Sequence, residues 1–217
     1  MNAIWAPELH VGSDGYWYVY FSADSPYKTN ETHRMHVLRG PKSDVDPSDP
    51  TSTFTYLGQL QGLPDQWQID GTVFMLNNQL YIVYSGWKLG DQNDNESLQQ
   101  LWIARMKSPF EADPAYKPVM ISNPQYPWEM WPNPNPTAMI NEGPTWLEFG
   151  SFRGIIFSAS ASWTPDYKLG ILQYVGPDPM NPNSWKKSPI PLLADNPNGQ
   201  GPYAPGHCSY LPPFPSL

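Results

Sequence analysis

The feature that most constrains this chain is an internal repeat of about 67 residues. A strand-like run ending in an aromatic residue, Ser and a small residue occurs three times, with the aromatic residues 63 and 73 positions apart at Phe21, Tyr84 and Phe157. Repeated units of three short strands and a weaker outer one are typical of β-propeller blades. A β-sandwich with coincidental internal similarity is the alternative.

Each unit is predicted to contain the same three strands in the same order. The first strands are predicted at 5–10, 69–74 and 141–146, with a fourth start at 205–210. The second strands are predicted at 16–23, 79–86 and 153–160. The third strands are predicted at 33–38, 101–106 and 168–172. The first strand of a propeller blade runs along the central axis, so residues on these strands are expected to meet at one mouth of a shared channel.

Composition agrees with an all-β fold and excludes several classes of function. The chain has 27 Pro and 16 Gly among 217 residues, which rules out a helical bundle. Its net charge of −8, without a Lys/Arg cluster, excludes a nucleic-acid binder. No apolar run approaches the length of a membrane span, and the start of the chain shows no secretion signal. The single Cys208 excludes an internal disulfide and a multi-cysteine metal site.

The number of units predicts a piece of a longer protein. Three full units and the first strand of a fourth fill the chain, whereas propellers close with 4–8 blades. We therefore expect residues 1–217 to be one domain that is truncated at both ends.

Two acidic residues stand near the axis of the predicted propeller. Asp70 and Glu142 lie in adjacent first strands, at positions that the repeat treats as equivalent, and each is followed by Gly. Hydrolysis of a glycosidic bond needs a carboxylic acid on one face of the sugar and a carboxylate that activates water on the other. The alternative is that both are ordinary turn residues beside a glycine.

Four ordered motifs give this chain a specific resemblance. The segments 5–10 (Trp-Ala-Pro-Glu-Leu-His), 69–74 (Ile-Asp-Gly-Thr-Val-Phe), 141–144 (Asn-Glu-Gly-Pro) and 205–207 (Pro-Gly-His) resemble those of glycoside hydrolase family 43. The resemblance implies a partial five-bladed β-propeller and an inverting hydrolase of the α-L-arabinofuranosidase or β-xylosidase type. It also implies an oligo- or polysaccharide substrate containing arabinose or xylose, and an extracellular location. We expect a monomer.

The resemblance also assigns roles to single residues. Glu142 would be the general acid, and Asp70 would orient this acid and raise its pKa. Trp5 would line the sugar pocket. His207 resembles the axial histidine that holds water or a calcium ion in the channel, although no cofactor is required.

One role has no residue to carry it. The catalytic base of the family is an Asp ahead of the motif at 5–10, and only residues 1–4, without an Asp, precede that motif here. We therefore expect impaired hydrolysis, because loss of a general base removes about 10²–10⁴-fold in rate. A non-catalytic sugar-binding propeller and a non-functional fragment are the alternatives.

The remaining candidates are weaker. His33 and His36 are three residues apart on a predicted strand, point to opposite faces and are expected to be surface residues. Trp87 and Trp163 follow the aromatic-Ser runs and are further candidates for sugar contact. Cys208 is expected to be a small buried residue rather than a nucleophile. The aromatic segment 126–132 is predicted to lie either over the pocket or between two blades.

Overall fold

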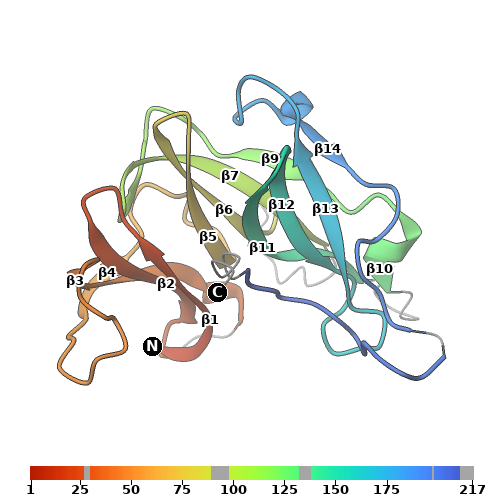
Figure 1. Cartoon of the computed structure of the whole chain (residues 1–217), viewed down its shortest axis with the longest axis horizontal. Helices are drawn as coiled ribbons and strands as arrows, with labels where there is room; N and C mark the ends of the chain where they lie inside the picture. Colours follow the sequence, from red (N-terminus) through yellow and green to blue (C-terminus); the bar gives the residue numbers. More distant parts are fainter. Residues whose placement is uncertain (27–29, 89–97, 132–137, 197, 211–217) are drawn as a thin grey trace, which may run out of the picture.

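The computed structural model describes residues 1–26, 30–88, 98–131, 138–196 and 198–210, and the regular secondary structure of these residues consists mostly of strands. These strands form three successive blades that fan out from a common centre (Figure 1). Blade I contains β1 (Asn2–Val11), β2 (Tyr16–Asp24), β3 (Arg34–Lys42) and β4 (Thr55–Gln59). Blade II contains β5 (Gln68–Leu76), β6 (Gln79–Gly86), β7 (Leu98–Ser108) and β9 (Val119–Ser122). Blade III contains β11 (Ala138–Phe149), β12 (Phe152–Ala159), β13 (Lys168–Tyr174) and β14 (Trp185–Lys187).

Each blade is an antiparallel meander whose strands pair in chain order. The strands β1, β5 and β11 lie nearest the centre of the fan (Figure 1). Short extra strands add to blades II and III: β8 (Glu111–Ala112) pairs with β7, and β10 (Met130–Trp131) pairs with β11. In the described part of the chain, three short 3₁₀ helices occupy the connections: η1 (Asn30–Thr32), η2 (Pro127–Glu129) and η3 (Pro182–Ser184). The predicted strands of all three units are confirmed, and the sandwich alternative is wrong.

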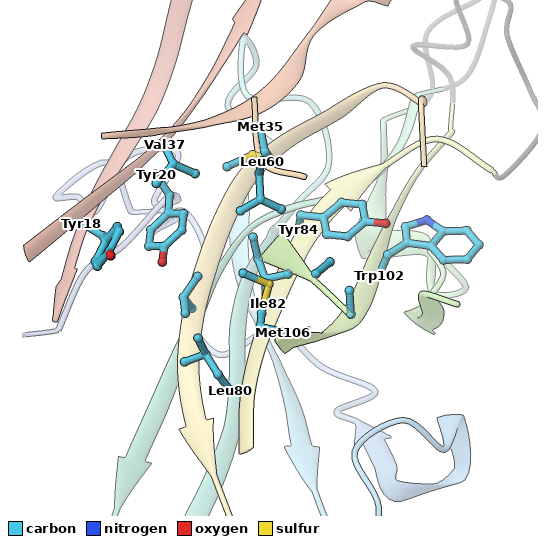
Figure 2. Close-up of a cluster of buried hydrophobic side chains, with 13 residues drawn as sticks. Tyr18, Tyr20, Met35, Val37, Leu60, Leu80, Ile82, Tyr84, Trp102 and Met106 are labelled. Carbon is cyan, nitrogen blue, oxygen red and sulfur yellow. The ribbon is translucent and has the colours of Figure 1, made fainter. Parts of the chain in front are cut away.

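The hydrophobic core lies between the blades rather than within one sheet. One cluster joins blade I to blade II, and Figure 2 shows Tyr20, Met35 and Val37 of blade I facing Leu80 and Ile82 of blade II. A second cluster joins blades II and III, and within it Phe74 stacks on Trp146 with ring centroids 4.1 Å apart. The central strand β6 contributes to both clusters on alternate residues. This double burial explains its nearly continuous apolar sequence.

Blades II and III are also joined through the backbone. The start of β11 pairs in parallel with the start of β7, where Met139 lies opposite Leu98 and Ile140 opposite Gln99. This pairing places the residues just before Glu142 against blade II. Among the described residues, no helix has the length and hydropathy needed to cross a membrane.

One predicted strand is wrong. Residues 205–210 form no strand, although they lie beside the inner strand of blade III, where the Thr145 hydroxyl donates to the Cys208 carbonyl at 2.7 Å. Pro205 lacks the N–H that a sheet ladder needs, and Ala204 and His207 have φ values of 43° and 42°. These backbone conformations break the extended geometry that the spacing of the repeat suggested.

The aromatic segment before Glu142 lies between blades, which settles one of the two alternatives. Glu129 at the end of η2 is fully buried, and its carboxylate accepts hydrogen bonds from Lys187 Nζ at 2.5 Å and Asn141 Nδ2 at 2.8 Å. Trp128 of the same segment donates to the carbonyl of Pro189 beyond β14. Residue 132, the last of the predicted segment, lies outside the described residues.

Candidate active site

The three inner strands carry a β-bulge at the same level. In each, two residues lie opposite the single aromatic residue of the second strand: Ala6 and Pro7 opposite Phe21, Asp70 and Gly71 opposite Tyr84, and Gly143 and Pro144 opposite Phe157. The first residue of each pair has a positive φ: 46° at Ala6, 56° at Asp70 and 50° at Gly143. Bulges of this kind re-aim side chains and are common beside active sites.

The bulges correct the equivalence that the repeat suggested. Asp70 aligns with Gly143, whereas Glu142 aligns with Ile69, so the two acids are offset by one residue. On regular strands a one-residue offset would send the two side chains to opposite faces. The bulge at Asp70 turns its carboxylate back, and both acids therefore reach one pocket.

That pocket has a volume of about 790 Å³ and brings together every predicted site residue. Asp70, Glu142, Trp5 and His207 all line it, although they are distant in sequence. The other lining residues are mainly aromatic or polar and include Trp67, Trp163, Tyr167 and Gln99. A second hollow of about 800 Å³ between the inner strands is lined by Glu8 and Glu148 but not by Asp70 or Glu142.

Glu142 has the properties of a proton donor. It is 8% exposed, and the pKa of its carboxyl is raised to about 8 from its ordinary 4.5, mainly by burial. The nearby Asp70 charge contributes to this increase, while a hydrogen bond from the Tyr167 hydroxyl to Oε1 at 2.9 Å acts in the opposite direction. Because this pKa lies above neutrality, the carboxyl keeps its proton at pH 7.

Asp70 is held against the residue that follows Glu142. Its Oδ2 accepts a hydrogen bond from the Gly143 backbone N–H at 3.0 Å. Burial raises the pKa of Asp70, whereas His207 and the Gly143 hydrogen bond act in the opposite direction. A buried aspartate with a φ of 56° is conformationally strained, and such strain is concentrated at functional sites.

His207 lies close to the same glycine. Its backbone N–H donates to Ser158 Oγ at 2.6 Å, and a Cβ added to Gly143 would come within 3.2 Å of its ring. Calcium takes six to eight oxygen ligands, and the described residues contain no group of three His, Cys, Asp or Glu side chains arranged to hold a metal ion.

Trp5 forms one wall of the pocket by stacking on a histidine. Its ring lies 3.8 Å from that of His33, which is 1% exposed. Each His33 ring nitrogen faces a backbone carbonyl, of Asn30 at 2.8 Å and of Ala3 at 3.0 Å. The prediction of a surface residue was wrong for His33, because η1 and the start of β1 cover it.

The other aromatic candidates take different positions. Trp163 is 62% exposed and lines the pocket. Trp87 is buried and does not line it, but stacks at 4.9 Å on Trp67, which does. Cys208 is half-buried, and its thiol lies 3.4 Å from the Tyr210 hydroxyl.

Sequence reasoning missed Tyr167, which contacts the predicted acid directly. Tyr167 follows β12 in a loop and belongs to none of the repeated runs. One aromatic residue among many in such a loop carries no pattern that would distinguish it.

These features define a β-propeller with a buried pair of carboxyl groups at its hub. Residues 1–212 match the model of Glycosyl hydrolases family 43, and the chain belongs to this family. The three blades are therefore part of a five-bladed propeller, as the motifs indicated.

Relatives of known function are arabinofuranosidases. The "Extracellular exo-alpha-(1->5)-L-arabinofuranosidase" of Streptomyces avermitilis is 32% identical over 211 residues, which are 95% of this chain and 39% of the relative. "Alpha-L-arabinofuranosidase 43" of Humicola insolens is 32% identical over 206 residues, which are 94% of this chain and 39% of the relative. The chain thus spans about 39% of the length of these two relatives.

A solved structure supports the same assignment. The alpha-L-arabinofuranosidase from Lactobacillus brevis superposes with a TM-score of 0.76 at 31% sequence identity. The match covers 94% of this chain and 59% of that chain.

Proposed function

We propose that this chain provides the acid side of an inverting glycosidase site for α-L-arabinofuranosides. The observation that carries the proposal is the buried Glu142 carboxyl, protonated at neutral pH and lying in one pocket with Asp70. The aromatic residues Trp5 and Trp163 offer faces on which a sugar ring can stack. The names of the relatives support arabinose as the sugar.

In the proposed reaction, Glu142 transfers its proton to the glycosidic oxygen as the bond from that oxygen to the anomeric carbon breaks. Water attacks the anomeric carbon from the opposite face and gives up a proton to a base. The Asp70 charge raises the proton affinity of Glu142, and its carboxylate holds the Gly143 backbone in place.

The described residues that line the pocket contribute two carboxyl groups, Asp70 and Glu142. We assign both to the acid side, because Asp70 is hydrogen-bonded to the residue after Glu142 and influences its pKa directly. The activation of water is then left without a carboxylate among these residues. We expect hydrolysis about 10²–10⁴-fold slower than with a base in place.

A second candidate is a sugar-binding protein without turnover. The aromatic lining and the pocket of about 790 Å³ favour it, since both serve binding without any base. The same pocket would then hold an arabino-oligosaccharide without cleaving it.

An azide experiment separates the two candidates. Azide is an anion and can attack the anomeric carbon in place of water without a base. With 4-nitrophenyl α-L-arabinofuranoside as substrate, azide should increase the slow rate of aglycone release. The product should be a glycosyl azide of inverted configuration. The variant Glu142→Gln should lower that azide-dependent rate, and Glu148→Gln on the same strand is the matched control.

Three outcomes decide against parts of the proposal. Hydrolysis at ordinary enzyme rates without azide would contradict the missing base. Calorimetric binding of arabinotriose with no release under azide would favour the sugar-binding candidate. A chain that neither binds arabinotriose nor releases the aglycone would overturn both candidate functions.

The location and cofactor needs of the protein belong to the same proposal. Two relatives are named as extracellular, and we propose that the protein to which this chain belongs is exported. The proposed chemistry requires no cofactor, because proton transfer from Glu142 and attack by water need only protein side chains and solvent.

A further inference from the structure

Tyr167 is fixed against Glu142 from three directions. Its hydroxyl donates to Glu142 Oε1 at 2.9 Å, and the Ser158 side chain is hydrogen-bonded to the same phenol. Its ring packs on the backbone of Gly206, where an added Cβ would lie 1.9 Å from Cε1. Tyr167 itself is 7% exposed, so water does not compete for these bonds.

The direction of these hydrogen bonds follows from the number of protons available. The His207 backbone N–H donates to Ser158 Oγ at 2.6 Å, which leaves the serine hydroxyl proton for the phenol oxygen. The phenol proton is then directed at Glu142 Oε1. Burial raises the pKa of Tyr167 and keeps it protonated, so it acts as a donor.

We propose that Tyr167 is a positioning residue that orients the Glu142 carboxyl and leaves Oε2 as the oxygen that carries the transferable proton. An acid whose Oε1 already accepts a hydrogen bond presents its proton from one defined oxygen. Tyr167 touches no reacting atom in this proposal and acts through Glu142. The role in catalysis rests on the function proposed above, whereas the effect on the carboxyl does not.

Among the described residues, few other groups face Glu142 and influence its pKa. Asp70 on β5 raises the pKa of Glu142, and Tyr167 from the loop after β12 lowers it. His207 acts on Asp70 and lies beside Gly143. Removing the Tyr167 hydroxyl changes one of these contributions and leaves Asp70 and His207 in place.

The test is a titration of Glu142 in this chain by NMR of glutamate labelled with ¹³C at the side-chain carboxyl. The chain has seven glutamates, and Glu142→Gln identifies the signal of interest. In Tyr167→Phe, loss of the hydrogen bond should raise the proton affinity of Glu142 by about tenfold. The control Tyr20→Phe removes a buried phenol that donates to the Pro109 carbonyl and should leave the signal unchanged.

A second variant keeps the proposal testable if Tyr167→Phe does not fold. Gly206→Ala retains the phenol but displaces its ring, and should shift the titration of Glu142 in the same direction. An unchanged titration in a folded Tyr167→Phe protein would overturn the proposal. Because this readout needs no substrate, a chain that neither binds nor cleaves sugar would refute the proposed function and leave this result standing.

Discussion

At the scale of single residues, the site depends on two strained or buried groups whose chemistry follows from their surroundings. Glu142 titrates far from its ordinary range because its carboxyl is buried beside a second acid. Asp70 adopts a left-handed backbone conformation, with a φ of 56°, at the bulge of β5. The sequence predicted both residues by type and motif, but their burial and the one-residue offset between them could not be predicted from it.

The raised pKa of Glu142 makes stability depend on pH. Between about pH 4.5 and 8 the folded protein keeps a proton that the unfolded chain has released, so the free energy of unfolding should fall as pH rises through this range. One proton corresponds to a slope of about 1.4 kcal/mol per pH unit. In Glu142→Gln this contribution disappears. Urea unfolding should therefore show that the stability of the variant increases relative to that of wild type as pH rises through this range.

The matched control for this experiment is Glu148→Gln, because Glu148 is an exposed residue on the same strand. Its stability curve should run parallel to that of wild type. A parallel curve for Glu142→Gln as well would show that the carboxyl is not protonated in the folded protein at neutral pH.

At the scale of elements, a buried polar cluster fixes the start of β11, which carries the acid. Asn141 directly precedes Glu142; its side chain donates to Glu129 and accepts from Lys187 Nζ at 3.0 Å and Ser122 Oγ at 2.7 Å. The backbone carbonyl of Asn141 accepts a hydrogen bond from Ser85 Oγ at 3.0 Å. These partners come from β6, β9, η2 and β14, so one asparagine ties blade II to blade III.

The serines of two aromatic-Ser runs have a related role, whereas the Ser22 hydroxyl donates to the Trp5 carbonyl within its own blade. Ser85 bonds to the inner strand of the next blade, and Ser158 bonds to His207 in the segment that follows blade III. In blades II and III the serine of the repeated motif therefore contacts the segment that follows its own blade. The sequence revealed the repeat, but a serine in one strand gives no sign of the partner that its hydroxyl reaches.

The ion pair in this cluster allows a stability prediction. Lys187→Met leaves the fully buried carboxylate of Glu129 without its counter-charge, and should cost about 3–5 kcal/mol in urea unfolding. The neighbouring Lys186 is exposed, and Lys186→Met should change stability by less than about 0.5 kcal/mol.

The double variant Lys187→Met with Glu129→Gln should lose less than Lys187→Met alone, because it leaves no buried charge. Equal stability of the Lys187→Met and Lys186→Met proteins would show that the pair does not form in solution.

At the scale of the whole molecule, the blades depend on one another because the hydrophobic clusters lie between them. Tyr20 and Met35 of blade I share one hydrophobic cluster with residues of blade II, and Phe74 of blade II stacks on Trp146 of blade III. A blade that opened alone would expose the face of its neighbour. The described blades should therefore unfold together.

A substitution in blade I tests this coupling. Met35 is fully buried against blade II, and Met35→Ala should cost about 2–5 kcal/mol through the cavity that it leaves. Circular dichroism and tryptophan fluorescence, which reports mostly on blades II and III, should show one shared transition shifted by the same amount. Met75→Ala, at a side chain that is 44% exposed, is the control. Separate transitions for the two signals would contradict coupling between the blades.

The sequence by itself determined the class of fold, the order of the strands and the family. Hydrophobic alternation and the spacing of the aromatic-Ser runs are properties of the sequence, and they can be recognised without knowledge of how the side chains pack. The four motifs also identified Trp5, Asp70, Glu142 and His207, and the structure places them around one pocket.

Only the tertiary structure decided how these residues meet. The bulges shift the register of each inner strand by one residue. Regular alternation of side chains would place Asp70 and Glu142 on opposite faces, and the bulges allow both side chains to reach one pocket. The contact between Tyr167 and Glu142 joins a loop to a strand of the same blade through side chains alone. Such contacts arise from packing in three dimensions and cannot be predicted from a pattern in the sequence.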